Sequence, residues 1–87
     1  MQDEISTIRE RINLLDEQLV QLLNERATAV LEVGKAQKRM GTKKYDPDRE
    51  RAILERIDAL NKGPLNKGAI EELFATIMTV CREIQSR

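Results

Sequence analysis

The fold is decided by residues 4–40, which read EISTIRERINLLDEQLVQLLNERATAVLEVGKAQKRM. Apolar side chains recur in this segment at steps of three and four residues, which is the spacing of one buried face on an α-helix. This apolar stripe consists of Ile5, Ile8, Ile12, Leu15, Leu19, Leu22, Val30, Val33 and Met40. Because Gly41, a typical helix-ending residue, directly follows this long periodic stretch, we predict one continuous helix over residues 4–40.

Two polar residues, Arg26 and Gln37, occupy positions where the stripe should continue, and at about 100° per residue both face the core. A buried arginine stays ionised, so Arg26 needs either an internal salt bridge, with Glu50 or Asp46, or an anionic ligand. Gln37 lies about 16 Å further along the axis. It is either a second contact to that ligand or a partly solvated residue near the helix end.

Two breaks interrupt the rest of the chain, at residues 41–45 and at Gly63-Pro64. Asp46 precedes Pro47, a pair typical of a helix N-cap and first helical position, and Asn66 is a second candidate N-cap. No segment alternates with a period of two residues, so strands have little support. We therefore predict an all-α chain with three helices, at 4–40, 47–61 and 67–86.

The length of the first helix predicts a dimer. A helix of about 37 residues measures about 55 Å, whereas a compact chain of this size has a radius of gyration of about 12 Å. The other two helices cannot cover it and still bury their own apolar faces. We expect residues 1–87 to form a single domain that pairs with a second copy in an intertwined, symmetric homodimer of six helices.

Composition excludes several classes of function. The 15 basic and 15 acidic residues cancel, so neither nucleic acid nor a membrane surface is an expected partner. The N-terminus has no apolar run, and Cys81 is the lone cysteine, which favours a cytoplasmic protein. Without histidine, a Ser-His-Asp triad, a Cys-His pair and a histidine-based metal site are impossible. We expect no cofactor and no metal, and Cys81 as a core residue more than a nucleophile.

The two shorter helices also combine apolar and polar positions. Asp46 and Glu50 lie at helical spacing with Ile53, on the edge of an apolar face, although acids in a first turn also serve the helix dipole. In the third helix, Gln85 follows Cys81 by one turn. The apolar positions of that helix are Ile70, Leu73, Phe74, Ile77, Cys81 and Ile84.

Five segments taken together resemble the all-helical chorismate mutase family, whose members stand alone or are fused to prephenate dehydratase or to the first enzyme of the shikimate pathway. These segments are IRERINLLDEQL (8–19), LLNERATAVLEVGKAQ (22–37), YDPDRERAILERI (45–57), NKGPL (61–65) and LFATIMTVCREIQ (73–85). Each segment alone is weak evidence for the family, but the order and spacing of all five match the family pattern over the whole chain.

The resemblance implies a site shared by two chains. Arg26 would grip a substrate carboxylate, Gln85 would hydrogen-bond the ether oxygen, and Arg9 would reach across the dimer into the partner's site. Arg49 would lie close to the bound ligand, and Asp46 and Glu50 would lie by the ring hydroxyl. Cys81 would be a small polar contact, and Val33 and Met78 would be apolar walls.

The implied reaction is the rearrangement of chorismate to prephenate, which needs a folded substrate and a stabilised ether oxygen but no covalent catalysis. Gln37 departs from the family pattern, because a lysine usually donates to that oxygen. This favours reduced but real mutase activity; a local shift that brings Lys38 inward and a domain that only binds chorismate or prephenate are the alternatives. An isochorismate pyruvate lyase and a plain dimerisation module with an Arg26–Glu50 ion pair also stay open.

Overall fold

The computed structural model describes residues 3–42 and 45–86, and all of its secondary structure is helical. Helix α1 spans Glu4–Met40, α2 spans Pro47–Leu60 and α3 spans Lys67–Gln85. The prediction of three helices is confirmed, with α2 and α3 each ending one residue earlier than expected. None of the described helices is both long and apolar enough to cross a membrane.

Local sequence explains where the helices begin and end. The Asp46 side chain accepts a hydrogen bond from the Arg49 backbone N–H at 3.1 Å, which makes Asp46 the N-cap of α2. Asn66 caps α3 in the same way, through the N–H of Ala69 at 2.8 Å. Helix α1 ends at Met40 because its C-cap, Gly41, has a φ of 70°, in the left-handed region that glycine adopts without strain.

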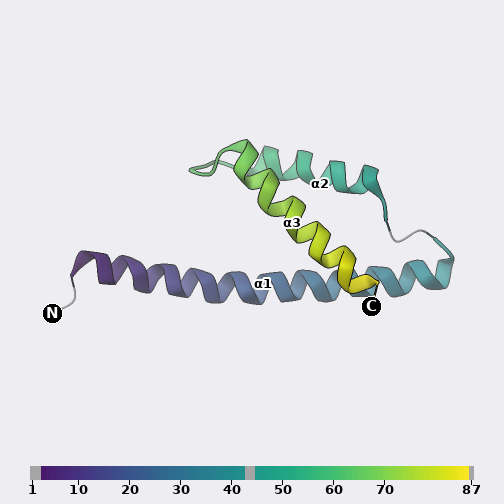
Figure 1. Ribbon diagram of the computed structural model, residues 1–87, viewed down its shortest axis with the longest axis horizontal. Coiled ribbons are helices and arrows are strands. Elements are labelled where there is room, and N and C mark those ends of the chain that lie inside the picture. Colours follow the sequence, from purple (N-terminus) through teal and green to yellow (C-terminus); the bar gives the residue numbers. More distant parts are fainter. Residues whose placement is uncertain (1–2, 43–44, 87) are drawn as a thin grey trace.

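The arrangement leaves half of α1 without cover (Figure 1). Helix α3 contacts both other helices, and its C-terminal end rests on the second half of α1. The chain extends over 60 × 25 × 16 Å with a radius of gyration of 16.6 Å, well above the value for a compact chain of this length. Along the uncovered half, apolar side chains are 40–60% exposed. Those that belong to the apolar stripe are Ile5, Ile8, Ile12, Leu15, Leu19 and Leu22.

Buried apolar side chains gather where α3 meets the other two helices. Met78 and Cys81 are each only 6% exposed, and Gly34 of α1 is buried against the same end of α3. This small core lies directly beside a cavity. The most buried part of the described chain therefore lies next to the candidate site.

Candidate functional site

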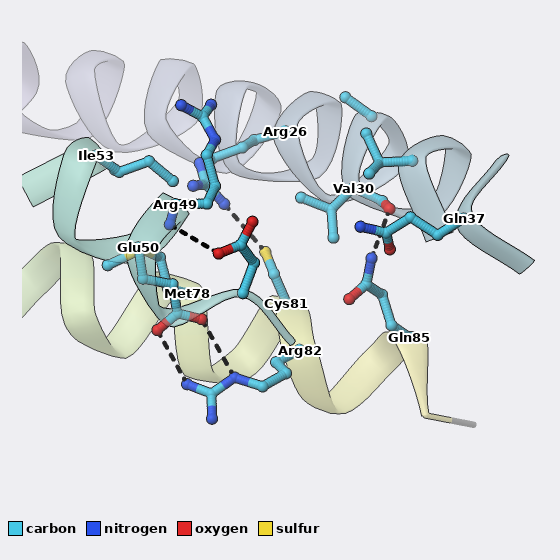
Figure 2. A pocket seen from close by; sticks show the side chains of 13 residues that line it. Arg26, Val30, Gln37, Arg49, Glu50, Ile53, Met78, Cys81, Arg82 and Gln85 are labelled. Atoms are coloured by element: carbon cyan, nitrogen blue, oxygen red, sulfur yellow. Dashed lines mark hydrogen bonds and ion pairs between the residues drawn. The ribbon is translucent and has the colours of Figure 1, made fainter. Parts of the chain in front are cut away.

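A cavity of about 340 Å³ opens between the three helices (Figure 2). All the site residues predicted from the sequence line it except Arg9. Helix α1 contributes Arg26, Val33 and Gln37, α3 contributes Met78, Cys81 and Gln85, and the start of α2 with its N-cap contributes Asp46, Arg49 and Glu50. Residues up to 59 positions apart in the sequence, Arg26 and Gln85, thus face one space. Their roles toward a ligand stay predictions.

Arg26 is half-buried and projects from α1 into this cavity. Its Nη1 donates to the Cys81 Sγ at 3.5 Å (Figure 2). A thiol is a weak acceptor, so this contact does little to offset the positive charge. Among the residues that the structure describes, no carboxylate forms an ion pair with Arg26.

The two acids that sequence analysis considered as internal partners of Arg26 are engaged elsewhere. Asp46 uses Oδ1 to cap α2, as expected of an acid at a helix N-terminus. Glu50 pairs with Arg82 of α3: Arg82 Nη2 lies 3.4 Å from Glu50 Oε1, and Arg82 Nε lies 3.4 Å from Glu50 Oε2. In the described part of the chain, the internal salt bridge to Arg26 is therefore not formed.

Gln37 and Gln85 lie at the same end of the cavity, near Val30 (Figure 2). The Gln85 Nε2 donates to the Val30 carbonyl at 2.9 Å, which fixes the amide against α1. This approach depends on Gly34, because a Cβ there would lie 3.1 Å from the Gln85 Nε2. The Gln37 Oε1 is buried and has no hydrogen-bond partner within the described residues. A buried amide oxygen without a donor is unusual and marks this end of the cavity as polar and unsatisfied.

Arg82 is the functional candidate that sequence analysis did not select. It lines the cavity, joins α3 to α2 through Glu50, and its Cζ lies 4.4 Å from the centre of the Tyr45 ring. A signal was present, because residues 78, 81, 82 and 85 follow the i, i+3, i+4, i+7 spacing of one helix face. The apolar lining that was not selected for the site is Ala29, Val30 and Ile53.

Arg9 lies apart from this group. It is exposed on the uncovered half of α1 and does not line the cavity of its own chain. The predicted role of Arg9 in a partner's site stays a prediction.

The cavity combines positive charge with hydrogen-bonding amides. Three arginines (Arg26, Arg49 and Arg82) face two acids, Asp46 and Glu50, so the lining carries one net positive charge. Within the described residues, no cluster of His, Cys, Asp or Glu could hold a metal ion. The arrangement is suited to binding and orienting an anion in a partly apolar space.

Known proteins with this sequence pattern share one activity in their names. The chain is 36% identical over 89 residues to a bifunctional chorismate mutase/prephenate dehydratase of Pseudomonas aeruginosa, and 40% identical over 78 residues to its Escherichia coli K12 counterpart. These alignments cover 97% and 88% of this chain but only 24% and 20% of the relatives, so the chain spans about a quarter or less of their length.

A solved structure extends the likeness to the whole fold. The chorismate mutase (form II) of Thermus thermophilus superposes with a TM-score of 0.95 at 30% identity, covering 98% of this chain and 97% of that one. Residues 8–86 match the family described as chorismate mutase type II. With three helices, an arginine-lined cavity and these matches in agreement, the chain belongs to the type II chorismate mutase family.

Proposed function

We propose that this chain catalyses the rearrangement of chorismate to prephenate in the cavity between its helices. The observation that carries the proposal is Arg26, a half-buried guanidinium without a carboxylate partner among the described residues. Leaving such a charge unpaired is unfavourable, so an anionic ligand stabilises it. Chorismate, with two carboxylates, supplies that anion.

The reaction fits the chemistry of the lining. One carbon–carbon bond forms while the carbon–oxygen bond of the ether breaks, and no proton is gained or lost. The protein therefore needs no nucleophile, general base or metal; it holds the flexible dianion in its reactive fold and stabilises negative charge on the ether oxygen. Guanidinium and amide groups at fixed positions serve both tasks.

Within this proposal, the polar donors divide between the two ends of the substrate. Arg26 binds one carboxylate, and Arg49 lies close to the ligand from α2. Gln85, held against α1 by its bond to Val30, and Gln37 face the ether oxygen. Because Gln37 is neutral where the family usually has lysine, we propose a slower mutase.

The other lining residues define the shape of the cavity. Asp46 and Glu50 accept from the ring hydroxyl, Cys81 is a small polar neighbour of Arg26, and Val33 and Met78 are apolar walls. Met78 and Cys81 are buried in the chain itself, which supports a rigid back wall. A rigid wall favours one folded conformation of the substrate.

We further propose a symmetric homodimer in which each α1 covers the other chain. The support is the row of half-exposed isoleucines and leucines on the N-terminal half of α1, which is a large apolar surface for a chain of this size. The same pairing would deliver Arg9 to the partner's cavity. Its charge would raise the net charge of the lining from one to two positive charges, which matches a dianion.

The dimer has its own test. Leu19→Glu places a charge in the apolar row and should convert the protein to a monomer with lower helix content, measured by analytical ultracentrifugation and circular dichroism. Asn13→Glu adds the same side chain about 120° round α1 from Leu19, outside the apolar row, and should leave the dimer intact. A dimeric Leu19→Glu variant would contradict this arrangement.

The proposed reaction is tested by offering the purified protein chorismate and isochorismate separately. We expect prephenate from chorismate and no pyruvate from isochorismate. Release of pyruvate would identify a lyase instead. Saturable binding of chorismate without any product would identify a regulatory domain, an alternative that the neutral Gln37 leaves open.

A further inference from the structure

Arg82 is held from two sides at the edge of the cavity. Its guanidinium approaches both carboxylate oxygens of Glu50 at 3.4 Å (Figure 2), and Tyr45 stacks on it with 4.4 Å between Cζ and the ring centre. The side chains of Arg82 and Glu50 are 38% and 26% exposed, so water screens this pair only in part. Only Nη2 makes a hydrogen bond, to Oε1, because the buried Nε has no hydrogen-bond partner within the described residues; its 3.4 Å distance to Oε2 is an ion-pair contact that also draws the second oxygen toward Arg82.

The position of Glu50 matters because three arginines line the same cavity. Glu50 shares that space with Arg26 and Arg49, and a carboxylate there can pair with any of them. In the structure, both of its oxygens are directed to Arg82. Arg26 is left with a hydrogen bond to the Cys81 sulfur and with no carboxylate partner among the described residues.

The geometry points to Arg82 as a positioning residue that keeps Glu50 away from Arg26, so that Arg26 stays available to an anionic substrate. Without Arg82, Glu50 is a carboxylate already inside the cavity, and it competes with the substrate for the same guanidinium. This inference rests on the proposed mutase function for its kinetic consequence. The expected movement of the Glu50 side chain toward Arg26 in the absence of Arg82 does not depend on turnover.

The kinetic test is a double-mutant cycle on Arg82 and Glu50. If Glu50 occupies Arg26 about 90% of the time in Arg82→Ala, the KM for chorismate rises about tenfold, while kcat changes by less than about twofold because bound substrate displaces Glu50. In an E50Q background, the neutral amide does not compete, so Arg82→Ala should change KM by less than about twofold. Arg82→Lys should restore most of the affinity.

A matched control separates this effect from the loss of any arginine on these helices. Arg51 forms an ion pair with Asp48 at 3.3 Å, but its side chain is 69% exposed and it does not line the cavity. Arg51→Ala should leave KM unchanged. Thermal unfolding of all variants reports on folding, and Arg82→Gln replaces Arg82→Ala if the alanine variant does not fold.

A crystal structure of the Arg82→Ala dimer without ligand tests the inference independently of activity. We expect a Glu50 oxygen within about 4 Å of a guanidinium nitrogen of Arg26, the ordinary limit for an ion pair, and a Glu50 paired with Arg49 instead would contradict the inference. A Glu50 that stays in place, or a KM effect of equal size with and without E50Q, would overturn the role of Arg82. Wild-type protein that does not convert chorismate would instead overturn the proposed function and leave the crystallographic test intact.

Discussion

Arg26 Nη1 lies 3.5 Å from the Cys81 Sγ, and this sulfur joins the middle of α1 to the last turns of α3. A guanidinium has five N–H donors, and a thiol accepts weakly, so most of the hydrogen-bonding capacity of Arg26 is not used by this contact. Because Glu50 is directed to Arg82, an anion is the strongest partner that the cavity leaves to Arg26. The charge of Arg26 is thus available for binding.

Gln37→Lys should raise kcat for chorismate by about 10²-fold, because one preorganised donor to a developing negative charge is typically worth 10²–10³ in rate. Gln37 lines the cavity, and its buried Oε1 has no hydrogen-bond partner among the described residues. An ammonium group at this place would donate to the ether oxygen. Steady-state kinetics of the two proteins measures the gain.

Lys38→Gln is the control for that experiment. Lys38 is exposed and does not line the cavity, so its loss should leave kcat unchanged. A large decrease of kcat in Lys38→Gln, together with an unchanged kcat in Gln37→Lys, would show that Lys38 turns inward and supplies the donor itself.

Mixing two inactive variants should restore activity if Arg9 acts in the partner's site. Arg9→Ala and Arg26→Ala each damage every site in their own homodimers. In a heterodimer, one site combines the intact Arg26 of one chain with the intact Arg9 of the other. Random exchange of chains gives about half heterodimers, so about a quarter of all sites should be intact.

The recovered activity is measured after unfolding and refolding the mixed variants together. About a quarter of the wild-type kcat per site is expected. If Arg9 served its own chain, every heterodimer site would lack one arginine, and the mixture would be as inactive as its components.

Gly34→Ala should lower kcat/KM by about tenfold, since small displacements of a positioned group can reduce the rate by up to 10²-fold. The new Cβ would lie 3.1 Å from the Gln85 Nε2 and displace the amide that bonds to Val30. Stability should change little, because alanine favours the helix by about 1 kcal/mol and offsets the crowding.

Gly68→Ala is the matched control for Gly34→Ala. Its Cβ would meet only the Asn66 Oδ1, at an ordinary 3.7 Å, near the start of α3. We expect unchanged kinetics for this variant. Unchanged kinetics in Gly34→Ala as well would mean that the position of Gln85 does not limit the reaction.

Glu71→Gln should stabilise the fold at neutral pH. Asp58 raises the pKa of Glu71, first through a hydrogen bond that the protonated acid makes with Asp58. The folded state therefore binds this proton more tightly than the unfolded state, and stability is lost as the pH rises from the unfolded pKa through the raised folded pKa. Glutamine donates to Asp58 at every pH and avoids that loss.

Denaturant unfolding at about pH 4 and about pH 7 measures this effect, because the two values lie on either side of an ordinary glutamate pKa. The gain from Glu71→Gln should be larger at the higher pH. An equal gain in the free energy of unfolding at both pH values would exclude the Glu71–Asp58 pair as the source of the stabilisation.

The sequence predicted the helices well because their boundaries are set locally. Asp46, Pro47 and Asn66 act on the first turns of their own helices, and Gly41 ends α1 through its own backbone conformation. The stripe positions of Arg26 and Gln37 follow from helix geometry alone, so their presence at the cavity was also predictable.

The choice of partners between helices was not predictable in this way. Whether Glu50 meets Arg26 or Arg82 depends on how α2 and α3 pack, and periodicity within one helix does not contain that information. The same holds for Gly34. Its missing side chain matters because Gln85, 51 positions later in the chain, packs against it, and the helical pattern does not predict that contact.

The most direct test of the account is the conversion of chorismate by the wild-type protein beside Arg26→Ala, followed as prephenate formed. We predict prephenate formation by the wild type, and a loss of kcat/KM of about 10²-fold or more in Arg26→Ala, in the range found when one partner of a buried charge pair is removed. Helix content and dimer formation should be unchanged in the variant. Equal turnover by the two proteins, or none by the wild type, would contradict the account.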